Sequence, residues 1–556
     1  MKPVHAAVLG VAASMSNAQP ADAIYVNATV HTVDDDRPSA SAFAVLDGAF
    51  LAVGDETSMM AHKGPDTQWV DLNGATVVPG LIDAHAHLSG LGQLELGILD
   101  LSWTSSYDQV IDVIKQRAET APPGEWIIGR GWDHESWPTR TLPHHDALTD
   151  AIPDHPVWLA RVDGHAALAN ARAMDLAGVS PESADPEGGE IMRDAEGNLT
   201  GVFVDAAEAL VNRVIPDSAY PDYAAMLIEG QRLCFEAGLT GMHDMGMSTA
   251  ESDLLRSLEA SGDLKLRVHA TIGKRDALEH MHDRLPYVGD RVQIKAIKLY
   301  MDGAMGSRGA WLLEPYADRP TDHDGDPWVG LATEDPEFVE TVANVCLERG
   351  YQLCTHAIGD RANREVLDAY ERSLISRAAI NDDHRFRVEH AQLLNPADIP
   401  RFAKLNVIPS MQARHATSDM RWVADRVGPV RASGAYAWQS LVNEGSIVAN
   451  GSDFPVEPHE PLLGFYATIT RQNEQGEPAE GWMPNERLSR PDALKSFTIW
   501  AAHAAFMEDL VGSITPGKRA DFTVLDTDIM ACEPKAILDT KILRTVVDGE
   551  TVFTNE

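Results

Sequence analysis

The sequence predicts an α/β protein: a (β/α)8 TIM barrel, a small β-sandwich domain built from both termini, and an insertion after the first barrel strand. Through the middle of the chain, apolar strand-like runs that end in polar residues alternate with helical stretches. This alternation is typical of parallel βα units. Short β-branched segments with glycine turns lie near both ends of the chain. Residues 101–235 are too long for a βα connection, which indicates an inserted subdomain.

The two ends of the chain share one strand pattern. Residues 22–78 contain AIYVNATVHTVD, SAFAVLDGAFLAVGD and WVDLNGATVVPG, which glycines divide into short segments. Residues 486–556 contain RADFTVLDTD and ILRTVVDGETVFT, which are β-branched and alternating. We therefore predict one β-sandwich domain from 22–78 and 486–556, with the barrel at 79–485.

Eight segments read as barrel strands. Helix candidates lie between them, such as PEFVETVANVCLERG and RANREVLDAYERSL, and the insertion contains two further strands, EWIIGRGW and PVWLARVDGH. A barrel of this kind carries its chemistry at the C-terminal ends of its strands. The eight segments are TVVPGLIDAHAHL, LTGMHDMG, LKLRVHATIG, VQIKAIKLYMDG, YQLCTHAIGD, RFRVEHAQLL, NVIPSMQ and SIVANGSDFP.

Composition limits the classes of partner. The chain has 556 residues, with 45 Lys and Arg against 84 Asp and Glu, a formal net charge of −39. So negative a surface repels phosphate backbones and anionic lipid, which argues against nucleic-acid and membrane-surface binding. The four cysteines show no CxxC spacing, and no apolar run approaches the ~18 residues of a membrane span. We expect a small-molecule substrate, and a homodimer is compatible with the sequence.

The N-terminal residues 1–21 have two interpretations. Lys2 precedes the apolar stretch AAVLGVAASM, and Ser16-Asn17-Ala18 forms a small-x-small cleavage pattern. This pattern fits a signal peptide, which would make the protein periplasmic or secreted. It also fits a disordered tail of a cytoplasmic protein.

Metal-binding residue types occur at the ends of strands one, five, six and eight, and a lysine lies inside strand four. Residues i and i+2 of a strand share a face, so both imidazoles of an HxH pair can bind one ion. A buried ammonium group would be costly unless it is neutralised or modified. Each residue alone is as easily a core or capping residue, but their recurrence at successive strand ends indicates a divalent-metal site, for which zinc is the best match. The candidate ligands are His85, His87, Lys298, His356, His390 and Asp453.

These residues lie in motifs that resemble the amidohydrolase superfamily of metal-dependent hydrolases, over nearly the whole chain. GLIDAHAHL resembles its first-strand motif, and VGSITPGKRADFTVLD followed by VVDGETVF resembles its C-terminal return into the β-domain. DGHAALAN, KLYMDGAMGSRGA, THAIGDRAN, VEHAQL and GSDFPVEP resemble a branch that includes N-substituted formamide deformylases. The resemblance implies that the four histidines are metal ligands and that Asp453 is both ligand and general base. It also implies that carbon dioxide carboxylates Lys298, which then bridges two ions; a one-metal site stays open.

The resemblance implies hydrolysis of a non-peptide C–N bond, in an amide, N-substituted formamide or carbamate, by a metal-activated hydroxide. Asp453 would accept the proton of the nucleophile and deliver it to the leaving nitrogen. The GxSxG motif is absent, which argues against a serine hydrolase. His165 is a candidate catalytic donor to the substrate carbonyl, with a supporting structural role as the alternative.

Three alternative functions stay open. An esterase or lactonase would use the same activated water. A deaminase of the same superfamily often places a Glu three residues after the fifth-strand histidine, where this chain has Gly359 followed by Asp360. A non-catalytic binding module of the same fold is the third, and retention of all six candidate ligands argues against it.

Overall fold

The computed structural model describes residues 19–322 and 325–555. The interpretation of residues 1–21 as a signal peptide or tail therefore falls almost entirely outside the described residues. Within the described ranges, no helix combines the length and hydropathy that a membrane span requires.

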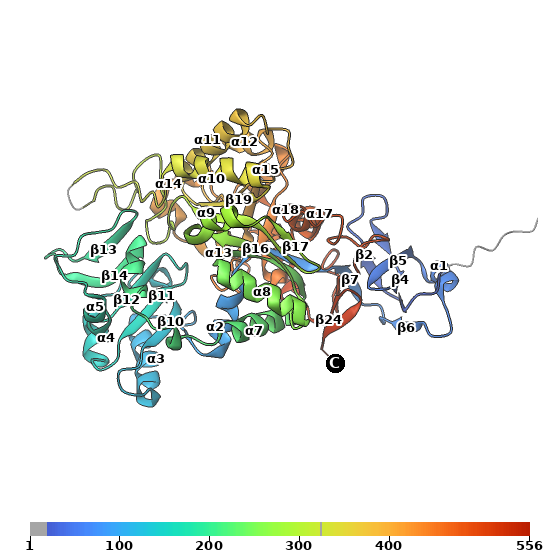
Figure 1. Ribbon diagram of the computed structural model, residues 1–556, viewed down its shortest axis with the longest axis horizontal. Helices are drawn as coiled ribbons and strands as arrows, with labels where there is room; N and C mark the ends of the chain where they lie inside the picture. The colour runs from blue at the N-terminus through green and yellow to red at the C-terminus, as the bar shows by residue number, and fades with distance from the viewer. Residues whose placement is uncertain (1–18, 323–324, 556) are drawn as a thin grey trace, which may run out of the picture.

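Eight parallel strands form the central barrel (Figure 1). They coincide with the eight predicted segments, and the predicted (β/α)8 barrel is confirmed. The first and last strands meet through the backbone, because Asp453 N donates to His85 O at 2.7 Å and His87 N donates to Phe454 O at 2.9 Å. In sheet order the strands are β8 (Leu81–Ala86), β15 (Leu239–Met247), β16 (Arg267–Gly273), β18 (Val292–Tyr300), β19 (Gln352–Ala357), β20 (Arg387–His390), β21 (Ile408–Gln412) and β22 (Ala449–Gly451).

Helices alternate with these strands along the chain. The helix α10 illustrates how the sequence begins and ends a helix. Asp335 caps its N-terminus, Pro336 occupies its first turn, and Gly350 ends it in the left-handed conformation. Its buried residues join the core around the barrel. The helices are α2 (Leu88–Leu96), α7 (Tyr223–Glu236), α8 (Thr249–Ser261), α9 (Lys274–Asp283), α10 (Pro336–Arg349), α11 (Asp360–Ser376), α12 (Ile399–Lys404), α13 (Ala413–Asp419), α14 (Val423–Ala432), α15 (Trp438–Asn443) and α16 (Pro461–Thr470).

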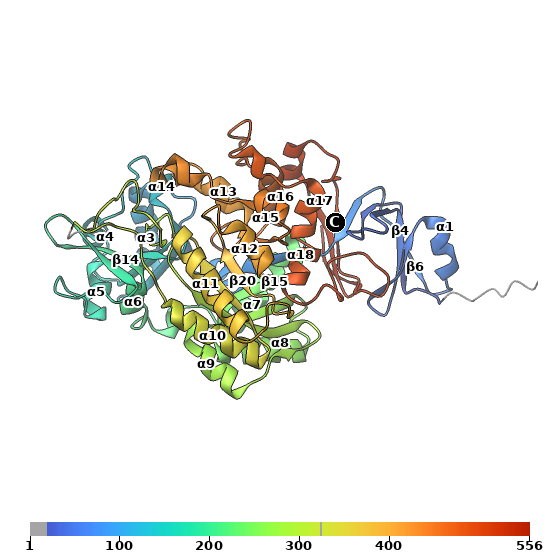
Figure 2. The same cartoon turned by 90° about the horizontal axis from the view of Figure 1, so that it is seen from above.

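The insertion is a separate sheet at one side of the barrel, opposite the terminal sheets (Figures 1 and 2). An apolar cluster lies on each of its faces, so the sheet is buried between helices and loops. The helix α7, which we expected inside the insertion, packs against α2 and β15 of the barrel instead. The insertion sheet contains β9 (Leu99–Asp100), β10 (Ile127–Trp132), β11 (Val157–Arg161), β12 (Ala166–Ala169), β13 (Gly189–Arg193) and β14 (Leu199–Asp205), with helices α3 (Tyr107–Thr120), α4 (His145–Ala151), α5 (Ala171–Ala177) and α6 (Ala209–Asn212).

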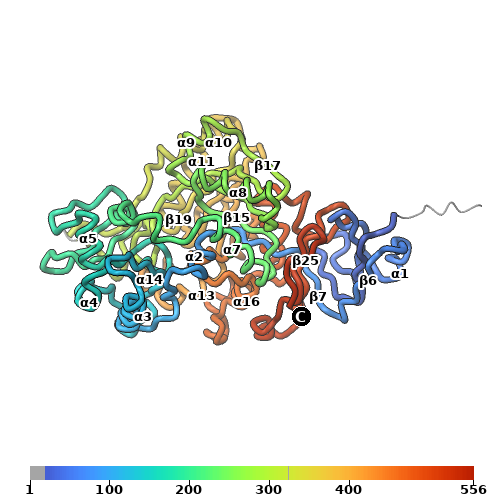
Figure 3. Tube along the Cα trace, turned by 60° about the horizontal axis from the view of Figure 1, so that its bottom comes forward, coloured from blue at the N-terminus to red at the C-terminus, as the bar shows by residue number. Residues whose placement is uncertain are grey.

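Segments from the two ends of the chain lie side by side (Figure 3). Their strands form two sheets that share one apolar cluster. Four aromatic rings lie at its centre, with centroids 4.9 Å apart for Tyr25 and Phe43 and 5.0 Å for Phe43 and Phe522; Phe50 packs edge-on against Phe43. One sheet contains β1 (Ala23–Val26), β4 (Ala42–Leu46), β5 (Ala49–Gly54) and β6 (Gln68–Asp71); the other contains β2 (Thr29–His31), β3 (Ser39–Ala40), β7 (Thr76–Pro79), β23 (Phe522–Leu525), β24 (Ile542–Val547) and β25 (Glu550–Thr554).

The boundary expected at residue 486 differs from the structure. The helices α17 (Arg490–Ser496) and α18 (Ile499–Ala504) follow this boundary, yet they pack on the barrel. Ala501 and Ala502 of α18 share a buried cluster with Ile82 and Ala449 of the first and last strands. The apolar faces of these helices cover the seam of the barrel, so the terminal sheets resume only at β23.

Phe522→Ala should destabilise the terminal sheets by about 3–5 kcal/mol, because it removes a fully buried ring from the aromatic cluster. Hydrogen exchange of the peptides that contain β1 and β23 measures this loss locally. Val430→Ala is the control: its side chain is 83% exposed, and the change should stay within about 0.5 kcal/mol. A loss below about 1 kcal/mol for Phe522→Ala would mean that the cluster does not hold the two sheets together.

Candidate active site

The six predicted ligands line one cavity at the C-terminal ends of the barrel strands. One donor atom each of His85, His390 and Asp453 lies within 4.8 Å of the others. His87 Nε2 lies 3.3 Å from Asp453 Oδ1, and Lys298 Nζ lies 3.4 Å from His85 Nε2. The ring of His356 joins the group, with its centroid 4.5 Å from that of His390. The barrel therefore brings together all six residues that the sequence nominated.

The backbone turns sharply where two of these side chains enter the cavity. His390 at the end of β20 has φ +70°, and Asp453 just after β22 has φ +63°. Residues with a side chain rarely adopt this left-handed conformation, which costs roughly 1–3 kcal/mol at such positions. Strain of this kind concentrates at functional sites, and here it occurs at two candidate ligands that each place a donor atom within 4.8 Å of one from His85.

Hydrogen bonds orient two of the imidazoles, those of His85 and His390, so that one nitrogen of each faces the cavity. His85 Nδ1 bonds Glu389 Oε2 at 2.7 Å, and His390 Nδ1 bonds Gln412 Oε1 at 2.8 Å. Both rings therefore turn Nε2 toward the centre of the group. His356 Nε2 is buried, and Asp302 Oδ1 lies 3.4 Å from it. The imidazole nitrogens and the Asp453 carboxylate that converge here form a donor set that fits a divalent cation with nitrogen and oxygen ligands.

Glu389 is fully buried beneath His85 and is kept charged by its neighbours. Burial opposes ionisation, but Arg387 and His85 hold the pKa of Glu389 well below its usual range. Arg387 Nε lies 2.7 Å from Glu389 Oε1, and its Nη2 donates to Ser410 Oγ at 2.7 Å. Such a carboxylate fixes the tautomer of a ligand histidine and raises its basicity.

Glu389→Gln should weaken metal affinity by about 10–100-fold, because an amide cannot hold His85 by a charge-assisted hydrogen bond. Competition titration with a chromogenic chelator measures this affinity. Glu229→Gln on the outer helix α7 is the matched control and should leave the affinity unchanged. An unaltered affinity in Glu389→Gln would show that Glu389 serves only the packing of Arg387.

Lys298 is almost completely buried in β18, with 1% of its surface exposed. Its Nζ lies 4.8 Å from the ring centroid of Tyr300. Burial lowers the pKa of Lys298, which favours the neutral amine. The parallel register places Lys298 beside Cys354 of β19, and Tyr300 beside His356.

His165 reaches the site from the insertion. Its Nδ1 bonds Asp205 Oδ1 at 2.7 Å, and its ring centroid lies 4.9 Å from that of His356. Burial alone would lower the pKa of His165, but the hydrogen bond and charge of Asp205 raise it to about 9. The imidazole thus stands over the candidate metal site with Nε2 as its remaining donor.

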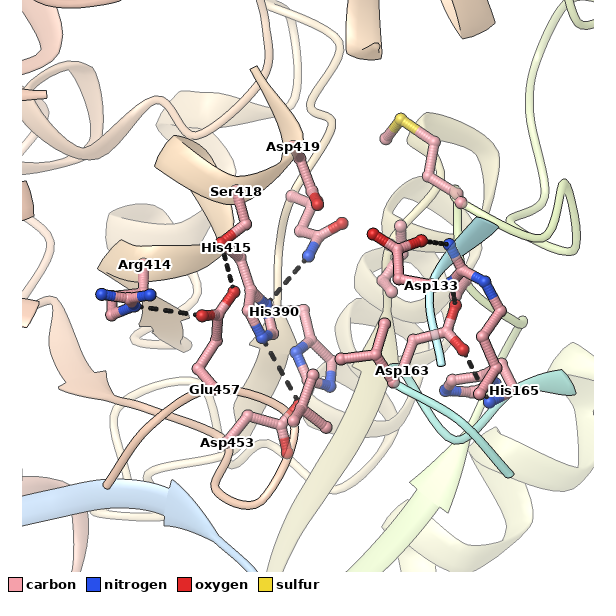
Figure 4. A pocket seen from close by; sticks show the side chains of 18 of the residues that line it. Asp133, Asp163, His165, His390, Arg414, His415, Ser418, Asp419, Asp453 and Glu457 are labelled. Atoms are coloured by element: carbon pink, nitrogen blue, oxygen red, sulfur yellow. Dashed lines mark hydrogen bonds and ion pairs between the residues drawn. The ribbon is translucent and has the colours of Figure 1, made fainter. Parts of the chain in front are cut away.

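The cavity has two lobes that meet at His165, His356, His390 and Asp453. The α13 lobe, of about 350 Å³, lies between α13 and the insertion (Figure 4). The β8 lobe, of about 340 Å³, lies beside the first strand. The α13 lobe is lined by Asp133, Arg161, Arg414, His415, Ser418, Asp419, Arg421, Trp422 and Glu457, among others; the β8 lobe is lined by His85, His87, Gln93, Arg130, Lys298 and Tyr300, among others.

Several supporting residues were not predicted from the sequence. Asp302 accepts hydrogen bonds from the backbone of Ile358 and Gly359, the turn that follows His356. Its position in LYMDG, two residues beyond the end of β18, was a signal that could have identified it. Glu389 directly precedes the predicted ligand His390, so its position in the sequence could also have identified it. Asp205 lies far from the other site residues in sequence, and no local pattern marks it.

Nearly the whole chain is similar to known proteins. It is 34% identical to Protein LONG AFTER FAR-RED 3 of Arabidopsis thaliana over 96% of this chain and 92% of that protein. It is 29% identical to the N-substituted formamide deformylase of Arthrobacter pascens over 95% and 97% of the two chains. The crystal structure of an uncharacterized metal-dependent hydrolase from Pyrococcus horikoshii superposes with a TM-score of 0.73 at 26% identity, covering 92% and 99%.

A family model described as "Amidohydrolase family" matches residues 68–553. This range includes the barrel, the insertion and the C-terminal strands, so the match extends over every element that builds the cavity. The motif resemblance noted in the sequence is thereby confirmed at the level of the family. The chain belongs to the amidohydrolase family of metal-dependent hydrolases.

Proposed function

We propose that this hydrolase cleaves the C–N bond of small non-peptide amides, with N-substituted formamides as the first class to test. The observation that carries this proposal is the convergence of Asp453 and the imidazoles on one cavity. The similarity to an N-substituted formamide deformylase over nearly the full length of both chains supports the choice of bond.

The histidines His85, His87, His356 and His390, together with Asp453, would hold a divalent cation, for which zinc suits the nitrogen-rich donor set. When bound there, the cation supplies Lewis acidity and lowers the pKa of water. Lys298 would contribute as a carbamate formed with carbon dioxide, and the lowered pKa of its amine favours that reaction.

The two oxygens of Asp453 face different neighbours. Oδ1 lies 3.6 Å from His85 Nε2 and 3.3 Å from His87 Nε2, whereas Oδ2 lies 3.8 Å from His415 Nε2 in the α13 lobe. Asp453 can therefore bind the cation through Oδ1 and use Oδ2 for proton transfer. It accepts a proton from the attacking water and delivers it to the leaving nitrogen as the C–N bond breaks.

His165 completes the site from the opposite wall. With Nδ1 bonded to Asp205, Nε2 is the nitrogen that can donate to the carbonyl oxygen of a bound substrate. The overall reaction converts an amide and water into a carboxylate and an ammonium ion, and it requires no protein nucleophile.

Chelation tests the metal requirement. Dialysis against a chelator should abolish hydrolysis of an N-formyl amine, and stoichiometric zinc should restore it, as measured by amine release with fluorescamine. Matched esters and amino-substituted heterocycles should be assayed in parallel. Hydrolysis of the esters alone would replace the proposal with an esterase, ammonia release from the heterocycles would replace it with a deaminase, and a metal-free, inactive but folded protein would indicate a binding module.

A further inference from the structure

The two lobes of the cavity differ in charge. This difference indicates which lobe binds the acyl half of a substrate and which binds the amine half. The inference rests on the proposed amide hydrolysis. It concerns Arg130, a residue of the insertion that the roles assigned above do not include.

Arg130 is a guanidinium group beside the candidate metal site that lacks a carboxylate partner. It lies in β10 and lines the β8 lobe with His87, Lys298 and Asp453. No carboxylate of the described residues lies within 4 Å of its nitrogens. The negative charges that act on it, chiefly those of Asp453 and Asp163, do so from beyond this distance.

The hydrogen bonds of Arg130 are also largely unfilled. Nη2 donates to Val162 O at 3.0 Å, and this is the only hydrogen bond of the side chain among the described residues. Nε is buried without a partner. A guanidinium carries five N–H donors in a planar fork that matches a carboxylate. The buried Nε is costly to leave unpaired, and the donors that remain beside the cavity can bind a ligand there.

The α13 lobe has the opposite character, because its arginines have carboxylate partners, as Figure 4 shows for Arg414 and Glu457. Arg161 lies 2.7 Å and Arg421 lies 2.6 Å from oxygens of Asp133, and Arg414 lies 3.0 Å from Glu457. Each of these guanidinium groups therefore has a carboxylate within 4 Å that neutralises its charge, whereas Arg130 has none among the described residues.

Asp419 adds a carboxyl group to this lobe, and burial raises its pKa to about 7. It accepts a hydrogen bond from Tyr436, and no cationic side chain of the described residues lies within 4 Å of it. The α13 lobe therefore suits a neutral or cationic group and disfavours a carboxylate.

The orientation of Asp453 indicates which half of the substrate enters each lobe. Its Oδ2 is the oxygen on the side of His415, in the α13 lobe. Because this oxygen must reach the leaving nitrogen, the departing amine belongs in that lobe and the acyl group belongs in the β8 lobe.

We propose that Arg130 binds the acyl side of the substrate and the carboxylate that forms there, while the departing amine occupies the acid-rich α13 lobe. Water supplies the oxygen of the new C–O bond, and the electron pair of the broken C–N bond goes to the amine, which leaves as an ammonium ion. The preferred substrates are amides of neutral or cationic amines, and N-acyl amino acids are poor substrates because their carboxylate would face paired arginines.

Binding of the two product types tests the orientation. Calorimetric titration of the zinc-loaded protein with acetate and with n-butylammonium gives a Kd for each. Arg130→Gln should raise the Kd of acetate by about tenfold, the effect of losing a charged hydrogen bond, and leave that of n-butylammonium unchanged. Arg130→Lys, which keeps the charge but loses the fork, should fall between wild type and Arg130→Gln.

Asp419→Asn is the matched variant in the opposite lobe. It should raise the Kd of n-butylammonium and leave the Kd of acetate unchanged. Zinc content and thermal unfolding of each variant must equal those of the wild type. The assignment of the acyl half to Arg130 would be overturned if Arg130→Gln left the Kd of acetate unchanged, or if it raised the Kd of acetate and of n-butylammonium equally.

Turnover separates this inference from the proposed function. N-butylacetamide should have a higher kcat/KM than N-acetyl-β-alanine, and an equal or reversed order overturns the substrate preference. If no amide is hydrolysed but the binding contrast holds, the proposed function fails while Arg130 still binds a carboxylate. If amides are hydrolysed and Arg130→Gln binds acetate normally, the orientation fails alone.

Discussion

Asp453→Asn is expected to lower kcat for amide hydrolysis by about 10³-fold, within the range that general acid–base catalysis contributes. The asparagine keeps the shape of the side chain but has no carboxylate to accept the proton of the attacking water. It also replaces one oxygen of the candidate metal group by a poorer ligand. The fold should survive, because the barrel seam uses the backbone nitrogen of this residue, which donates to His85 O.

Steady-state kinetics with zinc analysis of the same samples measures this effect. Asp112→Asn, on the exposed face of α3, is a control for the chemical change itself. Circular dichroism should show an unchanged fold in both variants. Wild-type turnover in Asp453→Asn at full zinc content would exclude Asp453 as the base, whereas loss of turnover together with zinc would assign its main role to metal binding.

Much of the site could be predicted because a parallel barrel converts sequence order into spatial position. Each strand end is a short apolar run followed by polar residues, and all eight ends lie on one rim. His356 and His390 end neighbouring strands, and His85 lies at the end of β8, so it meets them in the mouth that all the strand ends surround. The prediction therefore required recognition of strand ends and no knowledge of long-range contacts.

The parts that the sequence did not predict come from packing between distant segments. Arg130 and Asp205 belong to the insertion, whose position over the barrel mouth follows from contacts spread over many residues. The boundary at residue 486 failed for a related reason: α17 and α18, of 7 and 6 residues, are too short for their sequences to show which neighbour they cover. The charge difference between the lobes likewise depends on ion pairs such as Arg421 with Asp133, 288 positions apart.

Lys298→Ala is expected to lower metal affinity by about 10–100-fold or more and to remove most of the hydrolase activity. The truncation removes the amine that lies 3.4 Å from His85 Nε2 and, under the proposed carboxylation, an anionic ligand as well. Short carboxylic acids should restore part of the activity, because they can place a carboxylate in the space that the side chain leaves.

Lys295→Ala is a matched control from the same strand. Its ammonium lies 3.5 Å from the ring centroid of Phe506, away from the candidate metal group. It should retain full zinc content and turnover, as measured by elemental analysis and amine release. The wild-type protein grown with ¹³C-bicarbonate should show a carbamate carbon resonance that Lys298→Ala lacks. Full zinc content and activity in Lys298→Ala would show that Lys298 is not a metal ligand. The histidines and Asp453 would then form the metal site alone.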